Sequence, residues 1–546
     1  MNYARYMRVK IFLLTVIVCL VNQPISFAVD TDLPVSATQF NGDQRGNFGF
    51  VLRDSYLEAS ENSHLSAYAN GNTYLCESLD ESFCANSTFT NWDAIVIAPP
   101  CSIDASSICI NRLKVVDESG TSRSASLIRT IKTKSQFKGD LSKNLPTGST
   151  TSLWKIETEQ GAKTYAVHLI EHLQVGNVKT DKFKPAIFEL SIAEYVERSV
   201  PEAQTIGTKV MTYPDGKQGL INAGVPSKIN CAWQEQGVCG VEQVLNPNLR
   251  FEISFQIQSE LQGWLHGRLT DAQVKSEPIN ESLSMMTISG LPSFVPTVSA
   301  YVPYSDTTPE MKAMYANSSH AAIGDTVGYV ISSVGNAALK YLNVFSNVLK
   351  DRATSKLGIW SVGSLTSDVA SARNPCLTNS TGFIGLVTSN AMVYADAPPT
   401  LEDGSFNYKV AGLHYNPDGS VFSGYYGLTI SSSVVRCLYA MNEAPISATV
   451  SIIGESGEEK VVTTTIVEEN NWVRLSASGF SFSNPEIKVK FTQVQPPKAI
   501  PSPAPKSTVN PKPSITPLRQ ITCVKGKSVK KVSGSNPRCP SGYKKR

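Results

Sequence analysis

The chain has 546 residues, with 49 Lys and Arg against 46 Asp and Glu, a formal net charge of +3, and 11 cysteines. At this length several domains are expected rather than one. Because 41% of the residues are hydrophobic and 17% are charged, the chain can bury extended cores. This composition excludes global disorder and a highly charged nucleic-acid scaffold.

The N-terminus has the pattern of a secretory signal. Three basic residues precede an apolar run at residues 11–21, which is too short to cross a bilayer. Small residues at Ser26 and Ala28 then fit a cleavage site. We therefore predict a signal peptide at residues 1–28, export of the chain, and no transmembrane segment in the mature protein. A signal anchor that stays in place is the alternative.

Cysteine spacing predicts disulfide bonds. Removal of Cys19 with the signal leaves ten cysteines, and three pairs among them enclose seven residues each. An oxidising compartment makes disulfides the default state, whereas zinc sites favour shorter C-x2-4-C spacings that do not occur here. The last two pairs follow by elimination. The predicted pairs are Cys76 with Cys84, Cys101 with Cys109, Cys231 with Cys239, Cys376 with Cys437, and Cys523 with Cys539.

Most of the mature chain reads as β structure. Short runs of β-branched and aromatic residues alternate with turn residues, a pattern typical of β-sandwiches. We expect a β-rich region at residues 29–300, with a division into two subdomains near 140–150 as the alternative, and a sandwich of immunoglobulin-like or similar type at residues 365–494. The clearest strand-like runs are residues 94–97, 152–157, 164–175, 251–257 and 283–288.

One segment has a helical period instead. Between residues 334 and 352 the apolar residues Leu339, Leu342, Phe345 and Leu349 recur at helical spacing. We predict an amphipathic helix in a connecting region at residues 301–364. Packing against a sheet is the expected role, and a partner-binding helix is the alternative.

The composition changes sharply after the second β region. Residues 495–519 hold eight prolines and no acidic residue, which predicts an extended linker. Residues 520–546 form a small unit closed by two cysteines. The signal carries three of the positive charges and residues 495–546 carry twelve. Without these fifteen charges, the net +3 becomes −12 for the rest of the chain.

The basic C-terminal unit is the strongest binding signal in the chain. Clustered cations without acidic neighbours attract polyanions, and anionic wall or surface polymers are the partners expected for an exported protein. A specific nucleic-acid target is not indicated. A solubilising tail is the alternative. The candidate residues are Lys525, Lys527, Lys530, Lys531, Arg538, Lys544, Lys545 and Arg546.

The sharpest catalytic motif is an H-x-x-E-H string at His168, Glu171 and His172. On a helix the two histidines could hold zinc with Glu171 as general base. Apolar residues around the motif alternate with a period of two, however, and a strand would separate the histidines by about 13 Å. We therefore predict a strand and no metal or other cofactor, and the zinc peptidase remains the alternative.

No other motif nominates a reaction. The chain has no nucleophile elbow and no nucleotide-binding loop, and its remaining histidines are isolated in sequence. Trp264 and the pair Tyr425-Tyr426 are candidates for stacking on a sugar, with core packing as the alternative. A glycosidase needs only two carboxylates, so the sequence leaves a hydrolase open.

The C-terminal residues also carry a resemblance. The string T-C-V-K-G-K at 522–527, followed by K-K-V at 530–532 and P-R-C-P at 537–540, resembles a module of uncharacterised exported proteins from small-genome aquatic actinobacteria. Residues 407–439 are similar to exported proteins of the same group. The resemblance implies location outside the cell and carries no reaction.

These observations predict an exported, multi-domain, mainly β protein held at the cell surface by its cationic end. We expect the body to have a structural, adhesive or ligand-binding role. The competing hypothesis is an extracellular hydrolase of polysaccharide or peptide, tethered by the same end. The sequence leaves the oligomeric state open.

Overall fold

The computed structural model describes residues 45–493 and 519–546 apart from short gaps; of residues 198–243 it describes only the backbone, and only in part. The chain divides into two compact units, Met1–Gln493 and Val494–Arg546, which we call the body and the C-terminal unit. The gaps are residues 55–62, 70–71, 86–88, 90, 132–135, 159–160, 200–203, 206–207, 213–217, 223–229, 232, 236–237, 326, 366–373, 379–381, 444, 454–458, 463, 482–485 and 535. The predicted signal peptide and almost all of the predicted linker lie outside the described residues.

The protein is mainly β, as predicted. The first half of the body contains β1 (Asn47–Arg53), β2 (His64–Ala69), β3 (Asn72–Cys76), β4 (Asn91–Ile97), β5 (Cys109–Val116), β6 (Ser122–Ser124), β7 (Ser126–Thr130), β8 (Ser152–Thr158), β9 (Gly161–Val175), β10 (Lys184–Ser199), β11 (Gln204–Thr205), β12 (Thr208–Thr212), β13 (Gln218–Asn222), β14 (Asn230–Cys231), β15 (Trp233–Glu235) and β16 (Val238–Gln243). The second half contains β17 (Arg250–Gln258), β18 (Gly263–Gly267), β19 (Leu269–Pro278), β20 (Leu283–Pro303), β21 (Val327–Ser332), β22 (Ser355–Ser364), β23 (Phe383–Ser389), β24 (Val393–Tyr394), β25 (Thr400–Glu402), β26 (Ser405–Ala411), β27 (Gly424–Ser431), β28 (Ile446–Ile453), β29 (Glu459–Val462), β30 (Thr464–Glu469), β31 (Trp472–Phe480) and β32 (Glu486–Gln493).

The described helices are short. They are α2 (Ser82–Ala85), α3 (Pro309–Tyr315), α4 (Ser319–Ala322), α5 (Asn336–Ser346), α6 (Pro375–Thr378) and α7 (Ser432–Leu438), with 3-10 turns at Leu141–Lys143 and Tyr304–Asp306. Of the residues that the structure describes, none belongs to a helix that is both long and apolar enough to cross a membrane.

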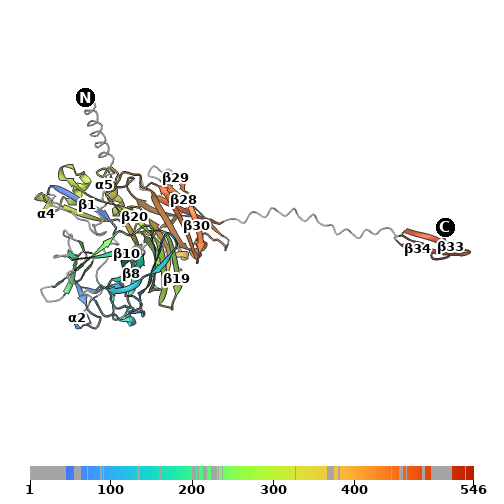
Figure 1. Ribbon diagram of the computed structural model, residues 1–546, viewed down its shortest axis with the longest axis horizontal. Helices are drawn as coiled ribbons and strands as arrows, with labels where there is room; N and C mark the ends of the chain where they lie inside the picture. Colours follow the sequence, from blue (N-terminus) through green and yellow to red (C-terminus); the bar gives the residue numbers. More distant parts are fainter. Residues whose placement is uncertain are drawn as a thin grey trace, which may run out of the picture. The chain divides into compact units, whose positions relative to one another are not determined.

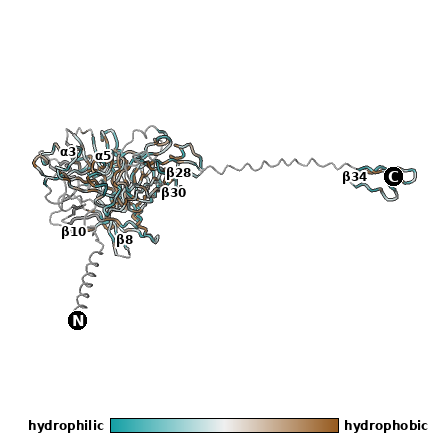
Figure 2. Tube along the Cα trace, turned by 90° about the horizontal axis from the view of Figure 1, so that it is seen from above, coloured by the Kyte–Doolittle hydropathy of each residue, from teal (hydrophilic) through white to brown (hydrophobic). Residues whose placement is uncertain are grey.

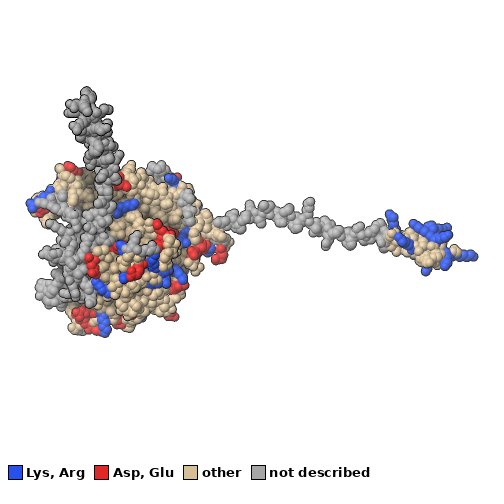
Figure 3. Space-filling view, in the orientation of Figure 1, with Lys and Arg blue, Asp and Glu red and all other residues tan. Residues whose placement is uncertain are grey.

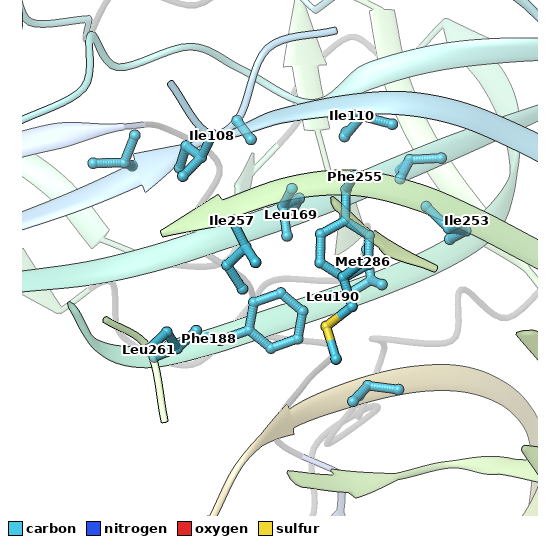
Figure 4. Close-up of a cluster of buried hydrophobic side chains, with 14 of the residues drawn as sticks. Ile108, Ile110, Leu169, Phe188, Leu190, Ile253, Phe255, Ile257, Leu261 and Met286 are labelled. Atoms are coloured by element: carbon cyan, nitrogen blue, oxygen red, sulfur yellow. The ribbon is translucent and has the colours of Figure 1, made fainter. Parts of the chain in front are cut away.

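A first core lies between two layers of strands. The antiparallel group β8, β9 and β10 forms one layer, and β5, β17 and the first part of β20 form the other. Phe188 of β10 stacks on Phe255 of β17 with ring centroids 5.5 Å apart, and Tyr165 meets Phe251 at 5.3 Å. Figure 4 shows Phe188 and Leu190 of the first layer beside Phe255 and Met286 of the second. Their packing arises because every second residue of each strand turns toward the same core.

A second core forms in the C-terminal part of the body. The strands β23, β27, β31 and β30 pair in that order, and the separate sheet β24-β26-β32-β28-β29 packs over them. Leu428 and Val473 of the first sheet share a buried cluster with Val450 and Val489 of the second. The disulfide between Cys376 and Cys437 joins the short helices α6 and α7 beside this core. Figure 2 shows hydrophobic and hydrophilic residues interspersed along the strands of the body.

The predicted amphipathic helix exists but is shorter than expected. The helix α5 spans Asn336–Ser346, and its Phe345 stacks on Phe50 of β1 at 3.8 Å between ring centroids. The apolar face of α5 therefore packs against a sheet strand, which is the role expected for this helix. Helical turns end by Lys350 and Asp351, which take left-handed φ values of 50° and 57°. The apolar period continues to Leu349, but two consecutive left-handed residues cannot continue a right-handed helix.

Strands pair with one another across the domain boundaries that the sequence predicts within the body. The long strand β20 pairs first with β17 and β19, then with β22, and finally with β1. Strand β22 also pairs with β10 and β18. Residues 29–300, 301–364 and 365–494 thus share sheets, and the finer division of the body stays a prediction. These elements are coloured along the chain in Figure 1.

Candidate polyanion-binding site

The C-terminal unit is a small three-stranded sheet. Its strands β33 (Arg519–Lys525), β34 (Ser528–Gly534) and β35 (Lys544–Lys545) lie in the order β34-β33-β35, all antiparallel (Figure 1). Gly526 has a φ of 59° in the turn between β33 and β34, a conformation that favours glycine. Cys523 is fully buried and forms the predicted disulfide with Cys539. Among the described residues of this unit it is the one buried side chain.

Each basic side chain that the structure describes in this unit is exposed. The unit contains no acidic residue, so its cations have no carboxylate side chain within it to pair with. Figure 3 shows blue side chains and no red ones on the visible face of the unit. The exposed residues are the eight predicted cations, Lys525, Lys527, Lys530, Lys531, Arg538, Lys544, Lys545 and Arg546, together with Arg519. The structure thus places all eight candidates in one folded unit.

The strand register distributes these cations over both faces of the sheet. Lys530 and Lys545 lie directly opposite Cys523, one on each neighbouring strand, and so share its face. Lys531 lies opposite Thr522, on the other face. Because neighbours along a strand point to opposite sides, the consecutive lysines cannot form a single row. The sheet therefore presents cations on both of its faces.

The body carries three of the other predicted disulfides. Cys76 bonds Cys84, Cys101 bonds Cys109, and Cys376 bonds Cys437, with Cα atoms 6.1, 4.9 and 5.7 Å apart. The side chains of Cys231 and Cys239 lie outside the described residues. Glu81 has an oxygen close to the sulfurs of Cys76 and Cys84. Since both sulfurs are in a disulfide, neither offers the thiolate that a metal site needs.

The H-x-x-E-H segment lies in a strand, as its period of two predicts. His168, Glu171 and His172 all belong to β9, which pairs with β4, β8 and β10. His168 and His172 are on one face, and Glu171 is on the other, toward the first core. His168 contacts the hydroxyl of Thr151, and burial lowers the pKa of His168 to about 3. The low pKa keeps this ring neutral inside the body.

Glu171 is a carboxyl group inside an apolar core. Its side chain is fully buried, and Oε1 accepts a hydrogen bond of 3.3 Å from the backbone N–H of Gln258. Burial raises its pKa to about 8 despite that hydrogen bond. Burial also lowers the pKa of His172 to about 4, a shift that nearby His64 increases and Asp93 opposes. Because His168 and His172 lie on one face of β9 and Glu171 lies on the other, the three side chains do not converge on one point.

Two of the three aromatic candidates belong to the core. Trp264 is 2% exposed and Tyr426 is fully buried, both within the second core. Tyr425 is half-buried, and its hydroxyl accepts a hydrogen bond of 2.8 Å from the backbone N–H of Asp271. For Trp264 and Tyr426 the structure shows core packing, the alternative considered for these residues.

One cleft of about 760 Å³ lies beside the Cys76–Cys84 loop. Three carboxylates, Asp80, Asp140 and Asp181, line it with Lys143. Asp140 accepts hydrogen bonds from the N–H and hydroxyl of Ser142, which lower its pKa, and Lys143 Nζ donates to a backbone oxygen. These contacts cap a turn and do not nominate a ligand.

Two polar contacts in the body escaped the sequence argument. Arg268 pairs with Asp54 in the interior, and His414 pairs with Asp351 beside a second cleft. The partners are 214 and 63 residues apart in the chain, and no motif links them. Only the folded topology brings them together.

No family model matches the chain, and the search of curated proteins finds no relative.

Proposed function

We propose that this protein is exported and held at the cell surface by its C-terminal unit, which binds anionic envelope polymers. The body then serves as the displayed part, with a structural, adhesive or ligand-binding role. The observation that carries the proposal is the C-terminal unit itself: nine exposed basic side chains, no acidic residue, and a disulfide that closes the fold.

Several features support an oxidising location. Disulfides persist outside the cytoplasm and are rare within it, and four join described cysteines of this chain. A unit of this size buries little apolar surface and needs a covalent staple. The proposed leader and the resemblance to exported actinobacterial proteins point the same way.

The charge arrangement favours a flexible polymer over a single small anion. Lys525, Lys530 and Lys545 share one face and Lys531 lies on the other, so the cations are divided between two faces of the sheet. A chain with repeated negative groups can meet separated cations in turn, and long-range attraction raises its rate of encounter. Exposed contacts of this kind weaken with salt because ions screen them within about 10 Å at 0.1 M.

The test uses the full mature chain and beads coated with polyphosphate, with neutral dextran beads as the reference. We expect the protein to bind the coated beads at low salt and to elute as NaCl rises. Replacing the eight basic residues from Lys525 to Arg546 by Gln should abolish binding. A matched variant that exchanges Lys and Arg at the same positions keeps the charge and should bind.

The same Gln variant should be released to the medium by cells that retain the natural protein. Retention of the variant would contradict the anchoring role. Binding of the Gln variant to the polyphosphate beads would contradict the assigned binding site.

A further inference from the structure

A second cleft in the body contains a charged and polar lining that the proposed function does not use. It encloses about 320 Å³ between the end of α5 and the residues after β26. That volume is at the lower end for small-molecule sites, which range from about 300 to 1,000 Å³. Its polar lining residues are Asn343, Ser346, Asn347, Lys350, Asp351 and His414.

Asp351 holds His414 through two contacts. Asp351 Oδ2 is 2.5 Å from His414 Nδ1, and Asp351 Oδ1 accepts the backbone N–H of His414 at 3.0 Å. An ionised carboxylate can only accept, so a ring proton sits on Nδ1, and the neutral form of the ring carries its lone pair on Nε2. Within the described part of the chain, Nε2 makes no hydrogen bond. This is the arrangement in which a carboxylate orients a histidine for proton transfer.

The backbone is bent to make that contact. Lys350 and Asp351 both take left-handed conformations although neither is glycine, a backbone state that non-glycine residues rarely adopt. Arg352 then ties the segment to the next loop by donating from Nε to the carbonyl of Pro417 at 2.8 Å. The left-handed pair places the Asp351 carboxylate against His414 and leaves Lys350 on the rim of the cleft.

Another histidine–aspartate contact in the body has none of these features. His320 Nδ1 lies 3.6 Å from Asp325, and the His320 side chain is 71% exposed. The His414 side chain is 35% exposed and lines the cleft. The two contacts provide a natural comparison between a surface pair and a pair in a cleft.

Water, rather than a side chain, is the nucleophile that this cleft allows. Ser346 lines it, but its hydroxyl donates to the backbone oxygen of Asn343 at 3.0 Å. The Lys350 ammonium and the Asn347 amide are donors on the same lining. Donors at that place can stabilise negative charge that develops on a carbonyl oxygen.

We propose that this cleft is a hydrolytic site for a small carboxylic ester, with His414 as general base and Asp351 as its positioning residue. His414 Nε2 takes a proton from water while the water oxygen bonds to the ester carbonyl carbon. The ester C–O bond then breaks with its electron pair going to the alcohol oxygen. The proton held by His414 passes to that oxygen, and the products are a carboxylic acid and an alcohol.

The test measures hydrolysis of p-nitrophenyl acetate by the full chain against equimolar free imidazole. We expect the protein to exceed imidazole, and His414→Gln to lower kcat/KM by about 100-fold, within the range for general-base catalysis. Asp351→Asn should lower kcat by about tenfold or more and leave KM unchanged, since it disturbs the base and not substrate binding. Added imidazole should restore part of the rate of His414→Gly.

His320→Gln is the matched control and should keep the full rate. Near-ultraviolet circular dichroism checks that each variant is folded. If His414→Gln does not fold, Lys350→Gln decides, because Lys350 is exposed and its loss should lower kcat about tenfold. The proposal is overturned if the wild-type rate is no higher than that of His414→Gln or of Lys350→Gln. It is also overturned if His320→Gln loses as much of the rate as His414→Gln.

Discussion

Arg268 Nε lies 2.5 Å from Asp54 Oδ2, and both side chains are fully buried. The guanidinium also donates from Nη1 to the backbone oxygen of Ala391 at 2.6 Å, and its carbon lies 4.6 Å from the ring centroid of Tyr394. Arg268 follows β18, and Asp54 follows β1. The pair therefore joins two strands that are far apart in the sequence, at a point where water does not reach.

We expect Asp54→Asn to destabilise the body by about 3–5 kcal/mol, because it leaves a buried guanidinium without a counter-charge. Replacing both residues by apolar ones, as in Asp54→Leu with Arg268→Met, should restore part of that loss. Urea denaturation of the full chain measures the free energy of unfolding. The control Glu252→Gln breaks the partly exposed pairs with Arg112 and Lys114 and should change the free energy of unfolding by less than about 1 kcal/mol. Equal effects of Asp54→Asn and Glu252→Gln would contradict the prediction.

Glu171 makes the body less stable as the pH rises. Its pKa is about 8 in the folded chain and near 4.5 when the residue is exposed, so the folded state holds one more proton between these values. Stability therefore falls as pH increases from about 4.5 to 8, by about 1.4 kcal/mol for each unit of pH. Glu171→Gln should remove this contribution and leave that of Glu189, whose pKa burial raises to about 7, whereas the exposed Glu118→Gln should keep both. Urea denaturation at pH 5 and pH 9 measures the difference, and identical slopes in the two variants would sink the idea.

His168 has the opposite effect in acid. Its pKa falls from 6.5 to about 3 on burial, so the unfolded chain binds a proton that the folded chain does not. The stability that neutral His168 contributes is thus complete above pH 6.5 and is lost as pH falls toward 3. His168→Gln should show a shallower loss between pH 6.5 and 4 in thermal unfolding. His320→Gln, at an exposed histidine, should retain the steep loss; a steep loss in His168→Gln as well would contradict this account.

Local pattern was sufficient to predict some elements. The period of two around His168 predicts β9, because alternate residues of a strand meet the same core. The helical stripe predicts α5, because residues three and four apart on a helix meet the same core. The point where the helical turns after α5 stop did not follow from the stripe, because it is set by the left-handed pair Lys350 and Asp351, and neither residue type signals that conformation.

Contacts across the fold could not be predicted from one sequence. The pairing of Arg268 with Asp54 depends on β20 changing partners from β19 to β22 to β1. The cleft at His414 depends on where α5 ends relative to β26. The cations of the C-terminal unit were found because they are clustered in the sequence, but their division between two faces required the register of β33 and β34.

The C-terminal unit should depend on its disulfide in a way that the body does not. Cys523 is its buried centre, and a loop of this length is stabilised by about 3 kcal/mol in the chain-entropy model. In the full chain, Cys523→Ser with Cys539→Ser should therefore abolish protection of β33 and β34 amides in hydrogen exchange measured by mass spectrometry. Cys376→Ser with Cys437→Ser is the matched control, because it removes a disulfide from the body and should leave β33 and β34 protected. Protected amides in the Cys523 and Cys539 variant would show that the sheet holds without its staple. Binding to polyphosphate beads should weaken but persist in that variant, because its cations remain while their spacing is no longer fixed.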